Sequence, residues 1–195
     1  MKSILIALST LFFLSFSGDD VKDYLSVKGP LNFNKTDFVL KWSDIPNEHY
    51  YIQEYLPEDE TPEHFNQMLT IHLFDSKLKL KDAVNQKVKE LNNRKKSDPI
   101  CNYQVTESPD GKEFIVDFLL GESKNNEMTT VEFNVYHYRQ IELSKKRKGI
   151  VILAYSERSY GNDITDFLKS LKVKRNAHLN EMISKDKPTI KLQEN

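Results

Sequence analysis

The five histidines are the residues best suited to metal or acid–base chemistry, and their spacing forms no recognisable metal motif. They are His49, His64, His72, His137 and His178. No pair has the i,i+4 spacing that presents two imidazoles on one face of a zinc-binding helix, and the pattern His-Glu-x-x-His is absent. His72 and His137 lie in segments predicted as strands, as do Glu54 and Glu132. A metal site built from these residues requires their strands to pair; otherwise one or two histidines are half-buried with ordinary hydrogen bonds.

Nucleophilic chemistry has no recognisable motif either. Cys101 follows Pro99 and Ile100 at the start of a predicted strand. With no local base to lower its pKa, we expect a buried, inert thiol. One cysteine also excludes intramolecular disulfides and multi-cysteine zinc sites. The pattern Gly-x-Ser-x-Gly is absent, and with six glycines the chain has no glycine-rich phosphate loop. The acidic run Glu58 to Glu60 is expected to be a solvated turn, because acid–base work needs a desolvated carboxyl. We therefore predict no catalytic residue, cofactor or metal.

The charge layout is the clearest non-random feature of the chain. Residues 44–63 hold seven acids and no lysine or arginine, whereas residues 76–97 hold eight bases against two acids, a local charge of +6. A second basic run follows at Lys145 to Lys148. We select six of these bases as a candidate basic face for a partner: Lys77, Lys81, Lys145, Lys146, Arg147 and Lys148. The pattern fits a surface that docks a protein or an anionic polymer. It also fits a solvated helix face and a polar hairpin tip that keep strand edges from aggregating.

Aromatic residues form a second cluster on or near the predicted strands. They are Trp42, Tyr50, Tyr51, Tyr55, Tyr103, Tyr136, Tyr138 and Tyr155. Aromatic rings on a sheet can stack on sugars or bind partners. More often they form core contacts or cross-strand pairs, and both interpretations stay open here.

Overall charge and the first residues limit the class of protein. The 195-residue chain has 28 bases and 29 acids, and a net charge near −1 argues against a dedicated nucleic-acid binder. Met1-Lys2-Ser3 precedes the apolar stretch Ile4 to Phe16, and Ser15 and Ser17 place small residues before Gly18. These features are typical of a signal peptide over residues 1–17, so we predict export to the periplasm or beyond. No later segment is long and apolar enough to predict a transmembrane helix.

Hydrophobic periodicity predicts one domain over residues 30–185, with a flexible lead-in over 18–29 and a flexible tail over 186–195. Strands are expected over 31–33, 38–42, 50–56 and 69–74, then over 103–107, 113–120, 129–143 and 150–155. Residue 61 should begin a short helix. The four residues Leu80, Val84, Val88 and Leu91 form one face of a longer helix. Two further helices are expected over residues 162–171 and 177–184, and the long strand 129–143 should contain a bend or bulge.

Four consecutive strands joined by tight turns favour an antiparallel meander. The segment Ile150 to Tyr155 is apolar on both faces and should be a central strand covered on both sides. The sequence therefore predicts an α+β protein: a single α/β/α layered domain with a mainly antiparallel sheet.

Two segments carry a resemblance to uncharacterised exported bacterial proteins with a Mog1/PsbP-like fold. Residues 55–70 look like the segment of those proteins that forms an acidic turn, a short helix and a strand. Residues 150–164 look like their closing segment. The resemblance implies a central antiparallel sheet flanked by helices. Its named members bind other proteins, but fold does not fix function, so no functional residue is carried over.

Two functional hypotheses follow. The first is an exported, non-enzymatic binding or accessory module whose partner is an envelope or extracellular protein or an anionic polymer, with no nucleic acid. The second is a hydrolase-type enzyme whose site residues are spread over several strands. A deep pocket with convergent polar groups would favour the enzyme, and a broad charged or aromatic face would favour the binding module.

Overall fold

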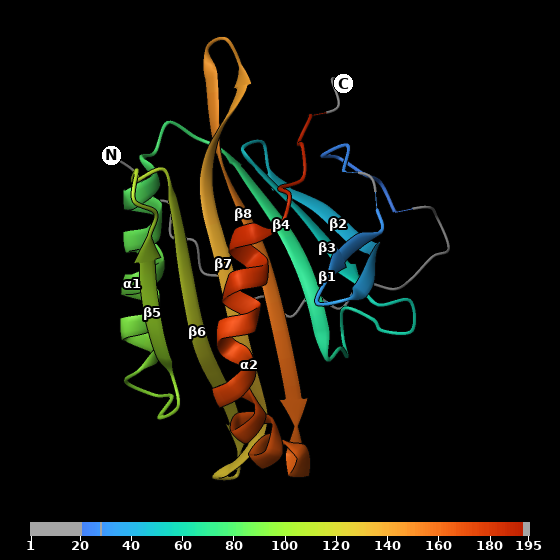
Figure 1. The fold of residues 1–195 in the computed structure, drawn as a ribbon, viewed down its shortest axis with the longest axis vertical. Helices are drawn as coiled ribbons and strands as arrows, with labels where there is room; N and C mark the ends of the chain where they lie inside the picture. Colours follow the sequence, from blue (N-terminus) through green and yellow to red (C-terminus); the bar gives the residue numbers. More distant parts are fainter. Residues whose placement is uncertain (1–20, 28, 193–195) are drawn as a thin grey trace.

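The computed structural model describes residues 21–27 and 29–192 (Figure 1). The predicted signal peptide, residues 1–17, lies outside these ranges. Among the described residues, no helix combines the length and the hydropathy that crossing a membrane requires.

The domain is built on one antiparallel sheet of eight strands in the order β1-β2-β3-β4-β8-β7-β6-β5. The strands are β1 (Leu31–Phe33), β2 (Thr36–Asn47), β3 (Tyr50–Leu56), β4 (Gln67–Asp75), β5 (Asn102–Glu107), β6 (Glu113–Lys124), β7 (Glu127–Ser144) and β8 (Arg147–Tyr160). The helices are α1 (Leu80–Arg94), the short 3-10 helix η1 (Gly161–Asp163) and α2 (Ile164–Ser184). Two hairpins close through Asn34–Lys35 and Asn125–Asn126, where both residues of each pair have positive φ. This is the type I′ geometry that matches the twist of paired strands.

The predicted order of the main elements is confirmed, with two corrections. Residues 61–64 form no helix; Thr61 and His64 make an isolated bridge in the β3–β4 connection. The two expected C-terminal helices are one continuous helix, α2, because residues 172–176 contain no helix-breaking glycine or proline. The bend expected in the long strand is present, as a register shift between Glu142 and Ser144 near the end of β7.

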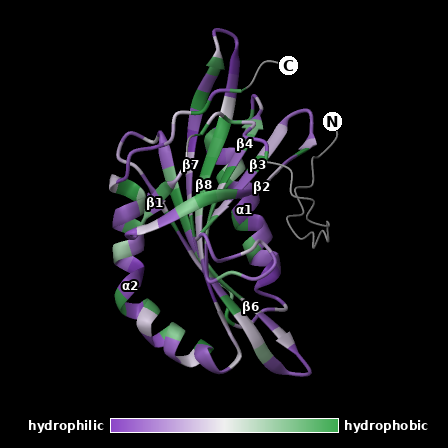
Figure 2. Cartoon of the chain, turned by 90° about the vertical axis from the view of Figure 1, so that its right-hand side faces the viewer, coloured by the Kyte–Doolittle hydropathy of each residue, from purple (hydrophilic) through white to green (hydrophobic). Residues whose placement is uncertain are grey.

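The two helices pack on opposite faces of the sheet. Val84 and Leu91 of α1 join Phe114, Val116 and Phe118 of β6 in one cluster, and the other predicted face residues, Leu80 and Val88, pack against it. Leu171 and Met182 of α2 belong to the larger cluster on the other face. Figure 2 shows that hydrophobic and hydrophilic stretches alternate along the strands.

The expected α/β/α layered sandwich of Mog1/PsbP type is wrong. The sheet is a curled half-barrel, and only one helix lies on each face. Eight strands span roughly 38 Å at the usual spacing, whereas a helix is about 10 Å wide, so one helix cannot cover a flat sheet of this size. The sheet covers itself by curling: the ring centres of Phe33 in β1 and Tyr155 in β8 lie 4.4 Å apart, although three strands separate β1 from β8 in the sheet order. Asn34, in the β1–β2 turn, also contacts His178 of α2. Helix periodicity carries no information about this curl.

Parts of the two segments predicted as a flexible lead-in and a flexible tail contact the core of the domain. Leu25 is fully buried and Val27 nearly so, although both lie in the predicted lead-in. Ile190 and Leu192, in the predicted tail, pack against the same cluster, and the Lys191 N–H donates to the Leu25 carbonyl at 2.9 Å.

One buried ion pair fixes α2 to the sheet. The Arg175 guanidinium donates to both carboxylate oxygens of Asp117, at 2.7 and 2.8 Å, and also to Gln104 of β5. The Asp117 side chain is only 6% exposed, so its charge depends on this partner.

We predict that Arg175→Ala lowers the free energy of unfolding by about 3 kcal/mol, because Asp117 is then left buried and unpaired. Urea denaturation measures this loss. Lys172→Ala, at an exposed position of α2, is the control and should change stability by less than about 0.5 kcal/mol. Adding Asp117→Asn to Arg175→Ala should recover part of the loss, since it removes the unpaired charge. Equal stability of Arg175→Ala and Lys172→Ala would contradict the role given to this pair.

Candidate partner-binding surface

The hairpin of β7 and β8 extends beyond the strands beside it. Pairing of β4 with β8 ends at Asp75 and Gly149, and pairing of β6 with β7 ends at Glu113 and Arg139. Residues 142–148 therefore pair only with each other, as a two-stranded ribbon that projects from one end of the sheet (Figure 1). We call residues 142–148 the ribbon. Its tip is coloured as hydrophilic in Figure 2.

The structure places all six predicted basic residues at the ribbon end of the sheet. Lys145 to Lys148 belong to the ribbon itself. Lys77 follows Asp75, whose strand partner is Gly149, and Lys81 lies in the first turn of α1. The remainder of α1 runs toward the opposite end, so its later lysines do not join this group.

Two of the six bases are neutralised by acids. Arg147 donates to Asp75 at 2.6 Å, a contact that ties the base of the ribbon to β4. Lys81 lies 4.0 Å from a carboxylate oxygen of Glu107. The other four, Lys77, Lys145, Lys146 and Lys148, are exposed and form no ion pair among the described residues. The uncompensated positive charge is thus concentrated on and beside the ribbon.

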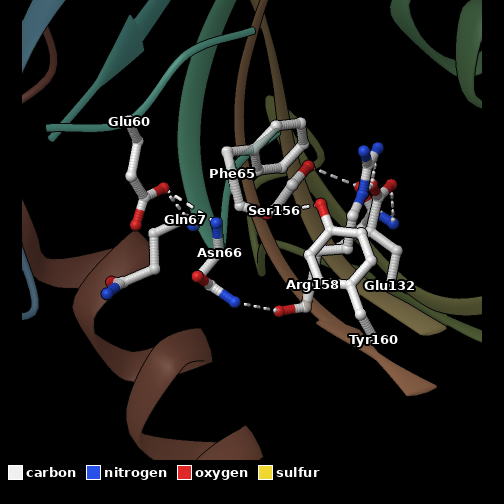
Figure 3. Close-up of polar contacts among 9 residues, drawn as sticks. Glu60, Phe65, Asn66, Gln67, Glu132, Ser156, Arg158 and Tyr160 are labelled. Carbon is white, nitrogen blue, oxygen red and sulfur yellow. Dashed lines mark hydrogen bonds and ion pairs between the residues drawn. The ribbon is translucent and has the colours of Figure 1, made fainter. Parts of the chain in front are cut away.

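The acidic run of the sequence lies mainly at the other end of the sheet. Glu58 to Glu60 and Glu63 belong to the β3–β4 connection, which leads into β4 at Gln67, opposite Glu157 near the end of β8. Glu60 has a structural role there, because one of its carboxylate oxygens accepts the backbone N–H groups of Asn66 and Gln67 (Figure 3).

A polar network crosses β7 and β8 on the α1 face, near that acidic connection (Figure 3). Ser156 donates to Asn134, Asn134 donates to Glu132, and Arg158 donates to Glu132 at 2.8 Å. The Arg158 guanidinium also lies 4.0 Å above the centre of the Phe65 ring. The network positions Arg158, and contacts of β8 with Phe65 and Asn66 hold the β3–β4 connection in place.

Glu54, which the sequence suggested only as one ligand of a possible metal site, lies on the same face of the sheet. Burial raises the pKa of its carboxyl to about 7; nearby Arg158 opposes the rise, and Glu63 and Glu132 add to it. No hydrogen bond to the Glu54 carboxylate is present among the described residues. A carboxyl with this pKa can exchange a proton near neutral pH.

His72 and His137 cannot share a ligand, because they lie on opposite faces. His72 is paired in register with Ile152 on the α1 face, whereas His137 is paired with Leu153 on the α2 face. Among the described residues, no group of three histidine, cysteine or carboxylate side chains is placed to hold a metal ion.

Each of these histidines has its own contact. The Tyr50 hydroxyl lies 3.0 Å from Nδ1 of His72, and burial lowers the pKa of His72 to about 3. Tyr50 therefore contacts a neutral ring. His137 lies 2.8 Å from Glu113, and burial lowers its pKa.

The thiol of Cys101 is buried and donates weakly to the Leu91 carbonyl, and burial raises its pKa. Of the predicted aromatic cluster, Tyr55, Tyr138 and Tyr155 are core residues. Tyr50 is half-buried and stacks on Phe74 with ring centres 4.6 Å apart. These four aromatic residues therefore belong to the core or to a cross-strand pair.

A model of an uncharacterised protein family matches residues 25–186. The chain belongs to this family. The match spans every strand and both long helices, from the buried Leu25 to just beyond α2. No curated protein and no solved structure matches the chain significantly. Family membership thus identifies the whole domain as the common unit.

The raised pKa of Glu54 makes stability depend on pH in a defined direction. The folded-state pKa of about 7 exceeds the ordinary value of 4.5, so the unfolded state loses this proton first as pH rises. The stability associated with Glu54 is therefore complete below the ordinary pKa and is lost as pH rises to the folded-state value. Glu54→Gln should be more stable than the wild type by at most roughly 3 kcal/mol near pH 8, and equally stable near pH 4.

Urea denaturation of both proteins at the two pH values measures this difference. Glu58→Gln, at an exposed position, is the control and should match the wild type at both values. The same difference between Glu54→Gln and the wild type at pH 4 and at pH 8 would contradict the assignment.

Proposed function

We propose that the protein is an exported binding module that holds an acidic partner, a protein or an anionic polymer, at the ribbon. The observation that carries this proposal is the projection of residues 142–148 beyond both neighbouring strands, with Lys145, Lys146 and Lys148 exposed and unpaired among the described residues. A ribbon that projects in this way can insert into the surface of a partner. Its positive charges attract an acidic partner before contact and so raise the association rate.

The ribbon end also meets a mechanical requirement of docking. The Arg147–Asp75 contact holds the base of the ribbon on β4, and Ile141 and Leu143 pack against the main core. The lysines are thus carried on an anchored element, which lowers the entropy lost on binding.

A hydrolase-type enzyme with residues on several strands is the second candidate. Glu54 favours it, because a carboxyl with a pKa of about 7 is suited to general acid–base catalysis. Substrate binding argues against it. The two best-formed cavities among the described residues, of about 300 and 180 Å³, are lined neither by Glu54 nor by the network of Figure 3. Loss of a measured hydrolase activity in Glu54→Gln, at unchanged stability below pH 5, would favour the enzyme.

Export is proposed from residues 1–17, and its test is independent of the ribbon. The mature chain should begin at Gly18, within about two residues, because Ser15 and Ser17 provide the small side chains that signal peptidase requires. N-terminal sequencing of protein recovered outside the cytoplasm measures this position. Ser17→Phe should accumulate as the uncleaved precursor. Exported protein that retains Met1 would contradict the proposal.

Binding at the ribbon predicts a strong effect of charge reversal. The triple variant Lys145→Glu, Lys146→Glu and Lys148→Glu should bind immobilised poly-glutamate with an association rate lowered about tenfold or more, at unchanged melting temperature. Wild-type binding should weaken steeply as salt rises, since exposed charges are screened within about 8–10 Å. Surface plasmon resonance at several salt concentrations measures both effects.

The matched control reverses three exposed lysines elsewhere: Lys89, Lys124 and Lys172. Both triple variants change the net charge equally, so only the position differs. Equal losses in the two variants would show a general charge effect and remove the ribbon as the site. The same pair of variants can then be used to identify partners captured from an envelope extract.

A further inference from the structure

The strand β5 presents a free edge of the sheet. It is the last strand in the sheet order and, among the residues that the structure describes, pairs only with β6, with no register shift. The opposite edge, β1, has only three residues. Edge strands are usually protected by proline, lysine, a bulge or very short length. Residues 102–106 of β5 contain no proline, no charge and no bulge.

A groove runs beside this edge on the α2 face. It has a volume of about 300 Å³ and is lined by Thr106 of β5, Ile115 of β6, and four residues of α2: Asn176, Leu179, Asn180 and Ile183. Ile183 of the groove is 56% exposed, and Val105 of β5, which pairs with Val116 on the α1 face, is 37% exposed. The edge is therefore flanked by apolar surface that folding of the described residues leaves uncovered.

The α1 face of the same edge carries positive charge. The Lys95 ammonium lies 4.8 Å from the centre of the Tyr103 ring and donates to Asn102. Lys81, near the other end of β5, is paired with Glu107, the only acid on the strand. A segment lying along β5 would thus meet the Lys95 ammonium on one face and the groove on the other.

We propose that β5 accepts an extended segment of another protein as a ninth strand, with acidic side chains toward Lys95 and apolar side chains in the groove. Successive side chains of a strand point to opposite faces, so alternating acidic and apolar residues match both surfaces at once. The unpaired backbone groups of β5 supply the hydrogen bonds, and the groove selects the side chain. This site goes beyond the proposed function, because it uses none of the ribbon residues.

The test uses the mature protein and a synthetic peptide, acetyl-Glu-Val-Glu-Val-Glu-Val-Glu-amide. In an added strand, every second peptide N–H faces β5. One test peptide is N-methylated at all its valines and the other at all its glutamates, so only one of them loses the N–H groups that face β5. That peptide should bind at least about tenfold more weakly, and the other should keep its affinity. Fluorescence anisotropy measures the affinities, and amide chemical shifts should change along β5 and residues 176–183 of α2.

Protein variants locate the site. Asn180→Trp, an exposed position that lines the groove, should weaken binding at least about tenfold by filling it. Val173→Trp, on the same helix but outside the groove, should bind as the wild type. The ribbon variant with Lys145, Lys146 and Lys148 reversed should also keep binding, which separates this site from the proposed function. Equal affinity of the two N-methylated peptides, or unchanged affinity of Asn180→Trp, would overturn the proposal. A dimer of the chain paired through β5 would overturn it as well, by assigning the edge to a second copy.

Discussion

Burial of β8 on both of its faces is the constraint on which the remaining structure depends. Residues 149–156 are buried throughout, with Val151, Leu153 and Tyr155 on one side and Ile150 and Ile152 on the other. A strand of this kind needs a partner strand on each edge and apolar cover on each face. β4 and β7 supply the edges, and the cores under α1 and α2 supply the faces. The order of the sheet, with its earliest strands on one side of β8 and its later strands on the other, follows from this central position.

Cover on the α2 face depends on polar contacts as well as on packing. Leu171 and Met182 are buried, but Val173 and Ile183 of the same helix are exposed, so the apolar surface of α2 is only partly used. Arg175 contacts Asp117, and farther along the helix His178 lies 3.0 Å from Glu157. The buried Asp117 carboxylate fixes the orientation of the helix, because a shift of α2 would separate it from Arg175. The curl of the sheet brings Asn34 to the same histidine. Helix orientation and sheet curvature are therefore coupled.

Much of the fold could be predicted from the sequence, because alternation and helical periodicity are local signals. The four residues Leu80, Val84, Val88 and Leu91 identified α1 and its buried face, and the apolar run at Ile150 identified the central strand. The curl was not predictable, since it depends on how β1 and β2 meet α2 across more than a hundred residues of sequence. The expected layered sandwich failed for that reason. The helix expected after Thr61 failed because Glu60 organises a turn by accepting two backbone N–H groups.

In the candidate site, too, some features have local sequence signals and others depend on the tertiary structure. Basic runs were visible in the sequence, but whether Lys77 and Lys145 lie at one end depends on the pairing of β4 with β8. The pKa of Glu54 depends on burial by neighbours from other strands, and no local pattern signals it. The one available clue was its place in a strand rich in tyrosine and isoleucine, where a carboxylate is unusual.

The hydrogen bond between Lys191 and Leu25 has a consequence for how the domain can be joined to other chains. The first and last segments of the fold lie side by side, so extensions at either end leave the domain from neighbouring points. In topological terms residues 25–191 form nearly a closed loop. A short connection from residue 191 to residue 25 would allow circular permutation, with new ends opened at the exposed Asn125–Asn126 turn. The same closeness suits insertion of the whole domain into a surface loop of a host protein, because both junctions would occupy little space.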